Sequence, residues 1–250
     1  MTSVSLETTE ISTAPGLTFE RDGAVLTARL DNAGGNLMTL DMCDALAAVL
    51  TTPPEGVHVL VLTAAGEKFC MGRERTAATP DDLPREVRRL IAVNEALAAT
   101  TLVTVARVHG DAAGFGVGLA ALCDVAVATR TAALNFPEVR INLAPALVLA
   151  WLPHMVGRRA AFWLTASGAP VSGDEAVRIG LLNEVVEDVE ALDAAVGQKV
   201  EALLAGEPRV HNEIRALLRS VESLSVPQSY ELASDKLVLG SLKRLHTPGH

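Results

Sequence analysis

The stretch HGDAAGFGVGLAALCD, residues 109–124, places four glycines between two apolar segments. TLVTVARV precedes it and DVAVAT begins at its end, and both are typical of buried strands. A strand that turns through glycines into a helix leaves the first N–H groups of that helix without intrahelical partners. Together with the helix dipole, such N–H groups can hold an oxygen atom that becomes negatively charged during a reaction. The stretch therefore predicts a strand, a tight turn and a helix, with the turn as a candidate functional site.

Other interpretations of these glycines lead to different proteins. Residues 114–118 follow the pattern G-x-G-x-G, whereas a dinucleotide site needs G-x-G-x-x-G and an acidic residue about 20 positions later. The glycine spacing here differs, no acidic residue closes a second strand about 20 residues on, and no Gly-Lys-Ser or Gly-Lys-Thr follows the glycines as in a P-loop. Close packing of the helix start against a neighbouring strand or helix stays open for one or two of the four glycines.

The composition indicates a globular protein with a sizeable core. The chain has 250 residues, of which 49% are apolar and 20% charged, so we expect one large domain, or one domain with an appendage. The formal net charge is −9 and the sequence holds no long basic run. This charge pattern argues against a nucleic-acid partner, because clustered Lys and Arg would be needed to bind phosphates.

Three cysteines, Cys43, Cys70 and Cys123, occur without a CxxC spacing, so we expect small buried residues in a reducing compartment. The six histidines are scattered, and no metal site is expected. The N-terminal residues lack the basic and apolar regions of a secretory signal. The longest apolar run, residues 141–156, is too short and interrupted for a bilayer span. We therefore expect a cytoplasmic protein without a membrane partner.

Strands and helices alternate through the first half of the chain. The residue patterns predict strands at 24–31, 57–63 and 102–108, and helices at 40–50 and 81–99. In the second helix, apolar residues form a helical stripe that only Asn94 interrupts. Short alternating strands and helices favour an α/β domain with parallel strand pairs.

From Pro145 onward the patterns are almost wholly helical. We expect helices at residues 145–156, 158–166, 172–180, 188–204, 208–222 and 227–244. Residues 1–16 are polar, and we expect them to be flexible. The predicted architecture is therefore an α/β core followed by a helical C-terminal portion.

Four segments resemble the crotonase superfamily, the enoyl-CoA hydratases and isomerases, in the same order and at similar spacing. The segments are AGEKFCMGRE (65–74), VHGDAAGFGVGLAALCDVAVAT (108–129), LNFPEVRINLAP (134–145) and SGAPVSGDEAVRIGLLNEVVE (167–187). The resemblance extends from about residue 18 to 190. It implies an α/β spiral of repeated β-β-α units over residues 17–190. It also implies a helical trimerisation region over residues 191–250, hence a homotrimer or a hexamer.

The resemblance also implies an acyl-CoA thioester substrate whose enolate is stabilised in an oxyanion hole. The hole would be formed by the backbone N–H groups of Arg73 and Phe115, although family members usually have glycine where this chain has Phe115. The Phe115 ring must point away from the thioester or narrow the pocket. The Arg73 side chain is a candidate partner for a CoA phosphate. The residues implied in substrate binding are Met71, Gly72, Gly114 and Ala146.

Hydratases of this family use two glutamates, and this sequence keeps one of them. Glu138 stands in the Phe-Pro-Glu motif and is the implied catalytic residue, whereas Gly118 occupies the position of the second glutamate. Three nearby groups, Asp111, Glu74 and His109, are candidate substitutes for the missing acid or base, or else cap and turn residues.

The sequence therefore predicts an enzyme of the enoyl-CoA hydratase/isomerase type that needs no cofactor besides the CoA of its substrate. With a single glutamate, we favour isomerisation of a 3-enoyl to a 2-enoyl thioester, because one base can move the proton from C2 to C4. Two alternatives are another reaction of the superfamily, such as decarboxylation or C–C bond cleavage, and a non-catalytic acyl-CoA-binding protein. Turnover of a panel of acyl-CoA thioesters would distinguish them.

Overall fold

The structure is a computed structural model that describes residues 13–246 of the chain. It consists of two compact units, one up to Gly206 and one from Glu207 onward. The segment expected to be flexible, residues 1–16, lies mostly outside the described residues. Each unit is described by itself below.

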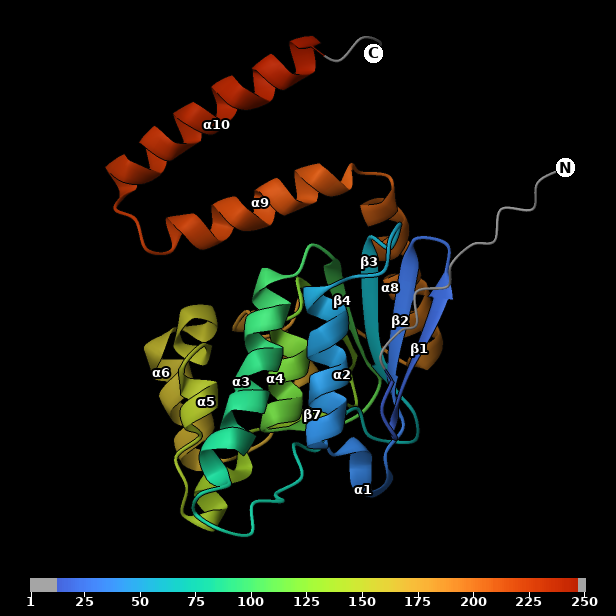
Figure 1. The fold of residues 1–250 in the computed structure, drawn as a ribbon. Helices are drawn as coiled ribbons and strands as arrows, with labels where there is room; N and C mark the ends of the chain where they lie inside the picture. The colour runs from blue at the N-terminus through green and yellow to red at the C-terminus, as the bar shows by residue number, and fades with distance from the viewer. Residues whose placement is uncertain (1–12, 247–250) are drawn as a thin grey trace, which may run out of the picture. The chain divides into compact units, whose positions relative to one another are not determined.

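The first unit is built on a six-stranded sheet (Figure 1). Its first two strands pair antiparallel, and every later strand adds in parallel, in the order β1-β2-β3-β4-β6-β9. The strands are β1 (Leu17–Asp22), β2 (Val25–Leu30), β3 (Val59–Ala64), β4 (Val103–Val108), β6 (Val125–Thr129) and β9 (Glu184–Val186). This arrangement confirms the α/β class and the parallel pairs predicted from the alternating patterns.

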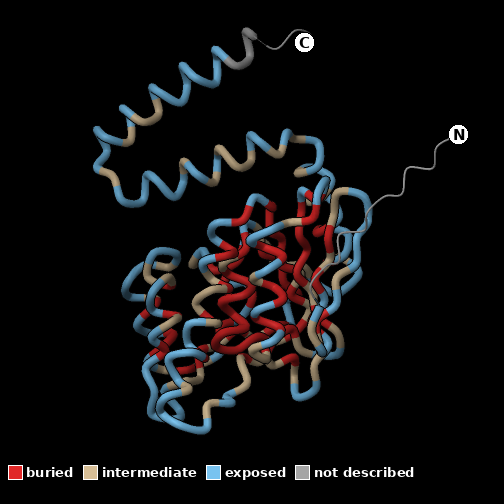
Figure 2. Tube along the Cα trace, viewed as in Figure 1, coloured by how far each residue is buried: buried red, intermediate tan, exposed pale blue. Residues whose placement is uncertain are grey.

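Helices cover both faces of this sheet. One face packs against α2 (Leu40–Thr51), α3 (Leu83–Ala99) and α4 (Phe115–Ala121), whereas α8 (Val189–Leu204) covers the other. Strand β3 shows the division, because Leu60 belongs to the first core and Val59 packs with Leu192 of α8. Figure 2 shows the buried residues concentrated in the sheet and in the helices packed against it. Burial on both faces explains why β3 and β6 are nearly continuous apolar runs.

A smaller three-stranded sheet and several short helices complete the first unit. The sheet has the order β5-β7-β8, with β5 (Ala112–Ala113), β7 (Ala133–Asn135) and β8 (Val171–Ser172). The helices are α1 (Ala33–Asn36), the 3-10 helix η1 (Pro137–Ile141), α5 (Ala146–Leu149), α6 (Leu152–Ser167) and α7 (Gly173–Arg178). The predicted helix at 145–156 is thus divided, because α5 ends at Leu149 and a new helix begins with Pro153 in its first turn.

The four glycines of residues 109–124 have separate roles. A Cβ atom on Gly110 would lie 2.0 Å from the carbonyl oxygen of Glu67, and one on Gly116 would lie 2.0 Å from that of Cys70. These two glycines allow the segment after β3 to pack directly against the turn. Gly114 and Gly118 line a cavity instead. Close packing therefore accounts for two of the four glycines, and the other two lie at the candidate site.

The second unit contains α9 (Pro208–Val221) and α10 (Val226–His246). The boundary at Gly206 differs from the one expected at residue 190, because α8 packs on the sheet and so belongs to the first unit. Along α9, Val210, Ile214 and Leu218 recur every four residues and are 40–60% exposed. No helix between residues 13 and 246 combines the length and the apolar character that a membrane span requires.

Candidate active site

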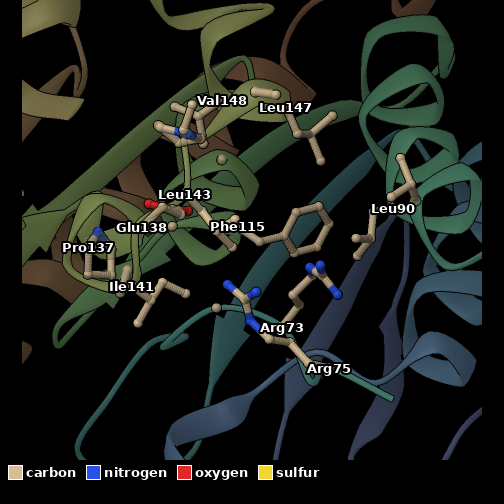
Figure 3. A pocket seen from close by; sticks show the side chains of 18 of the residues that line it. Arg73, Arg75, Leu90, Phe115, Pro137, Glu138, Ile141, Leu143, Leu147 and Val148 are labelled. Atoms are coloured by element: carbon tan, nitrogen blue, oxygen red, sulfur yellow. The ribbon is translucent and has the colours of Figure 1, made fainter. Parts of the chain in front are cut away.

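One cavity of about 430 Å³ opens in the first unit, beside the glycine-rich turn. It lies between α3, the start of α4, η1 and the segment that leads into α5 and α6 (Figure 3). Its larger apolar lining residues are Met71, Val87, Leu90, Phe115, Ile141, Leu143, Leu147, Val148 and Trp151. The predicted binding residues Met71, Gly72, Gly114 and Ala146 all line it. An apolar cavity with few polar groups is typical of a small-molecule site.

Two backbone turns meet at this cavity. A Cβ atom on Gly72 would lie 3.5 Å from the carbonyl oxygen of Ala113, so the turn at 71–73 lies directly beside the turn at 113–115. The Ala113 N–H donates to the Cys70 carbonyl at 2.9 Å, which joins the two turns. The residue after each glycine, Arg73 and Phe115, lines the cavity.

The hydrogen bonds that hold these turns do not involve the backbone N–H groups of Arg73 and Phe115. Met38 and Arg73 are paired in an isolated β-bridge. The Met38 N–H donates to the Gly72 carbonyl and the Glu74 N–H donates to the Met38 carbonyl, so this β-bridge uses neither the N–H nor the C=O of Arg73. The Gly114 N–H donates to the Asn135 carbonyl at 2.9 Å, and Phe115 is the first residue of α4. Within the described residues, neither Arg73 nor Phe115 donates its backbone N–H to a protein acceptor.

The Phe115 side chain contributes to the wall of the cavity. Phe115 is 7% exposed, and Figure 3 shows its ring in the middle of the view, between Leu147 and Arg73. Phe115 lines the cavity, so its side chain takes up space there that a glycine would leave open.

Glu138 extends from η1 toward the glycine turn. A Cβ atom on Gly114 would lie 2.6 Å from Glu138 Oε1, which places the carboxylate against the Gly114 backbone. Glu138 Oε2 is buried and accepts no hydrogen bond within the described residues. The Leu143 N–H donates to the Glu138 carbonyl oxygen and fixes the backbone of η1. The site therefore holds a buried carboxylate oxygen without a hydrogen-bond donor among the described residues.

The Arg73 side chain forms an ion pair that the sequence did not indicate. Its Nη1 pairs with Glu86 Oε1, on a carboxylate that is 3% exposed. Glu86 Oε2 accepts hydrogen bonds from the Thr76 N–H and hydroxyl and from the Ala77 N–H. Burial lowers the pKa of the Arg73 guanidinium, as does the positive charge of Arg75, whereas the negative charge of Glu138 raises it. Because Glu86 binds the Arg73 guanidinium, the expected contact with a CoA phosphate gains no support.

Trp151 occupies the space in front of Gly118. A Cβ atom on Gly118 would lie 3.5 Å from Cζ2 and 3.9 Å from Nε1 of the indole. The indole packs edge-on against Phe136, with ring centroids 6.3 Å apart. An indole N–H is a hydrogen-bond donor only, so Trp151 cannot replace the base that Gly118 lacks.

None of the three candidate substitute groups lines the cavity. Asp111 pairs with Lys68 at 2.5 Å and accepts from the Ala133 N–H, and these contacts lower its pKa although burial acts in the opposite direction. His109 Nε2 lies 2.9 Å from the Gly66 carbonyl oxygen. Glu74 lines a separate surface hollow with Thr39 and Arg89, among others. The structure therefore gives no support for any of the three as a substitute acid or base at this cavity.

The sequence analysis did not single out Trp151, which lines the cavity, or Glu86, which pairs with Arg73. Glu86 and Trp151 carry no motif that marks them; only the fold brings them to positions 73 and 118. Asn94, the residue that interrupts the apolar stripe of α3, also lines the cavity. Within residues 13–246, no cluster of three or more His, Cys, Asp or Glu side chains is arranged to hold a metal ion.

The sequence model of the enoyl-CoA hydratase/isomerase family matches residues 20–237. The chain belongs to the enoyl-CoA hydratase/isomerase family. A curated member of this family, an enoyl-CoA hydratase of Alternaria alternata, is 28% identical over 191 residues, which are 76% of this chain. The chain spans 64% of the length of that relative.

Solved structures of the family have the same fold. An enoyl-CoA hydratase of Mycobacterium smegmatis superposes with a TM-score of 0.85 at 29% identity, over 91% of each chain. A putative enoyl-CoA hydratase of Thermobifida fusca, solved in complex with CoA, has a TM-score of 0.84 at 26% identity and covers 97% of this chain and 99% of its own. These likenesses confirm the crotonase-like fold that the four sequence segments predicted.

Proposed function

We propose that the protein is an acyl-CoA enzyme that moves a proton on a thioester substrate through an enolate. Glu138 is the base, and the N–H groups of Arg73 and Phe115 receive the negative charge on the thioester oxygen. The observation that carries this proposal is the position of Glu138: it lines the same cavity as Arg73 and Phe115, and its carboxylate lies against Gly114, beside the two backbone N–H groups that have no acceptor among the described residues. A preorganised donor in such a hole contributes about 10²–10³ in rate.

Within this activity, we propose isomerisation of a 3-enoyl to a 2-enoyl thioester. Glu138 takes a proton from C2, the electron pair of the C–H bond moves onto the thioester oxygen, and the same carboxylic acid returns the proton at C4. Hydration would require a second group to hold and deprotonate a water molecule. The Trp151 indole fills the space next to Gly118, where such a group would otherwise project, which supports isomerisation over hydration.

The test is turnover of matched substrates by the wild-type protein. A 3-enoyl thioester should be isomerised faster than crotonyl-CoA is hydrated, with products identified by mass and by NMR. Faster hydration of crotonyl-CoA would contradict the single-base mechanism. Products with fewer carbons would favour the alternative of decarboxylation or C–C cleavage, and binding without turnover of any thioester would favour a non-catalytic acyl-CoA-binding protein.

We also propose that the chain assembles as a homotrimer or a hexamer through its second unit. The apolar residues of α9 are partly or largely exposed, with Leu218 at 60%. Surfaces of this kind are commonly covered in an oligomer. Light scattering at micromolar concentration should give three or six times the mass of the chain, and a monomer mass would contradict the proposal.

A further inference from the structure

Asn36 joins the segment that follows β2 to the loop that follows β3. The two strands are parallel neighbours and pair through their last residues, so their carboxyl ends lie side by side. Asn36 Nδ2 donates to the Ala65 carbonyl and to the Lys68 carbonyl, both at 2.8 Å. One buried side chain thus ties the end of β2 to the loop at residues 65–74, which contains the first of the two turns at the cavity.

The Asn36 amide has partners for its oxygen and for both of its protons. Besides the two bonds from Nδ2, Oδ1 accepts from the Asn32 N–H at 2.9 Å. Turning the amide over would place Oδ1 against two carbonyl oxygens and Nδ2 against an N–H group, so only one orientation keeps these bonds. The backbone at Asn36 has a φ of +58°, a region that asparagine adopts more readily than most residues. Both the side chain and the backbone at position 36 therefore favour asparagine.

The residues on either side of Asn36 hold the backbone around the Arg73 N–H. The Met71 N–H donates to the Gly35 carbonyl at 2.9 Å, and Met38 forms the β-bridge with Arg73. These bonds fix the peptide groups next to the Arg73 N–H and leave that N–H itself without a protein acceptor among the described residues. The direction of the Arg73 N–H therefore depends on where residues 35–38 lie, and the Asn36 amide is the side chain that sets their position against the loop.

We infer that Asn36 is a positioning residue for the first donor of the proposed oxyanion hole. It does not line the cavity, so it acts through the backbone of Arg73 and not by touching the substrate. This inference rests on the proposed function, in which the Arg73 N–H receives charge from the thioester oxygen. A donor that is misplaced by about 1 Å can cost about 10²-fold in rate, so a residue remote from the chemistry can still control it.

Kinetics of Asn36→Gly test the inference. Glycine adopts the same left-handed backbone without strain, so this variant removes only the three hydrogen bonds of the amide. With the thioester that the wild type converts fastest, kcat should fall about 10- to 100-fold with little change in KM. Asn183→Gly is the matched control, because Asn183 Oδ1 accepts from the Ala126 N–H at 2.7 Å but the residue does not line the cavity. The control should lower the free energy of unfolding and leave kcat unchanged.

Infrared spectroscopy of bound butyryl-CoA, labelled with ¹³C at the thioester carbonyl, reads the oxyanion hole without turnover. Donors in the hole polarise the carbonyl and lower its stretching frequency relative to the free thioester. Asn36→Gly should move this band back toward the free value, whereas Asn183→Gly should leave it in place. A purely structural role of Asn36 would not move the band in a folded protein. If Asn36→Gly does not fold, Asn36→Asp gives the same comparison, because it keeps the acceptor for the Asn32 N–H and loses both donors.

The outcomes separate this inference from the proposed function. If the wild type converts a thioester and polarises its carbonyl, an unchanged kcat and band position in the Asn36 variant overturn the role of Asn36 and leave the proposed function in place. A loss confined to the free energy of unfolding, or to KM, overturns it in the same way. A wild-type protein that binds no CoA thioester, or that leaves the carbonyl band at the free value, overturns the proposed function and this inference together.

Discussion

The Glu138 carboxylate lies against the backbone of Gly114, and a Cβ atom at position 114 would be 2.6 Å from Oε1. Gly114 has a φ of +50°, which residues with a side chain rarely adopt, and it directly precedes Phe115, whose backbone N–H has no acceptor among the described residues. One glycine thus allows both the turn that presents the N–H of Phe115 and the approach of the base to that turn.

Gly114→Ala should impair both functions of this glycine. The left-handed backbone costs about 1–3 kcal/mol in the free energy of unfolding, and the new Cβ displaces the Glu138 carboxylate. Turnover should therefore fall by more than the loss in the free energy of unfolding explains. Gly23→Ala is the matched control, because Gly23 has a φ of +56° but no atom within 4 Å of its Cβ position. Full activity in Gly114→Ala would show that the carboxylate need not lie at this turn.

Glu138→Gln should lower turnover by about 10²–10⁴, the usual contribution of a general base, while calorimetry shows unchanged affinity for acyl-CoA. The amide has the same shape but cannot accept the proton. Glu95→Gln, an exposed change on α3, should behave like the wild type. If Glu138→Gln keeps most of the activity, the base is another group.

The resemblance could identify Glu138 and the two turns because these residues lie in short segments that are read directly from the sequence. The glycines of residues 109–124 also predicted the strand–turn–helix unit, since their spacing reflects a local backbone requirement. Asn94 was visible only as an interruption of an apolar stripe; the pattern showed the face but not the cavity on it. Close approaches between distant segments, such as Gly110 to Glu67, depend on tertiary packing that spacing does not encode.

Two boundaries, one between helices and one between the two units, also depend on packing that the sequence pattern does not reveal. The division between α5 and α6 occurs inside an apolar run, where Pro153 begins a new helix although the hydrophobic pattern continues. The sequence predicts α8 as a helix in the same series as α9 and α10, yet Leu192 of α8 packs against the sheet. Periodicity identifies a helix but not the partner that its apolar face contacts.

Glu86→Gln should weaken the support of the Arg73 turn. Glu86 is buried and binds Arg73, Thr76 and Ala77. Loss of its charge leaves a partly buried guanidinium unpaired, so we expect about 1–3 kcal/mol of destabilisation. The N–H of Arg73 would also shift, and a misplaced donor should lower kcat about 10- to 100-fold with little change in KM. Glu95→Gln on the same helix is the control; a change confined to KM would assign Glu86 to binding alone.

His109 should make the protein less stable in mild acid. Burial lowers its pKa, the hydrogen bond to the Gly66 carbonyl offsets part of this effect, and Nδ1 is buried without a partner among the described residues. Because the folded-state pKa is below the unfolded value of about 6.5, the unfolded chain binds the proton first. Stability should therefore fall as pH drops below about 6.5, by at most about 1.4 kcal/mol per pH unit for this proton.

His109→Gln should reduce this pH dependence, measured by chemical denaturation between roughly pH 7 and pH 5. Gln keeps an N–H that can donate to the Gly66 carbonyl but does not titrate. His58→Gln, at an exposed histidine, is the matched control. The same slope in His109→Gln and in the wild type would contradict the assignment.

The space between Gly118 and Trp151 allows the preference for isomerisation to be tested by substitution. Gly118→Ala should be tolerated, because its Cβ makes an ordinary contact at 3.5 Å and alanine favours the helix by about 0.5–1 kcal/mol. Gly118→Glu alone should not create a hydratase, since the added carboxylate meets the indole. Gly118→Glu combined with Trp151→Ala makes room for both the carboxylate and a water molecule, so hydration of crotonyl-CoA should rise above that of the control Gly118→Ala/Trp151→Ala. If Gly118→Glu alone raises hydration and remains folded, Trp151 moves aside readily and the indole is not what keeps water from the substrate.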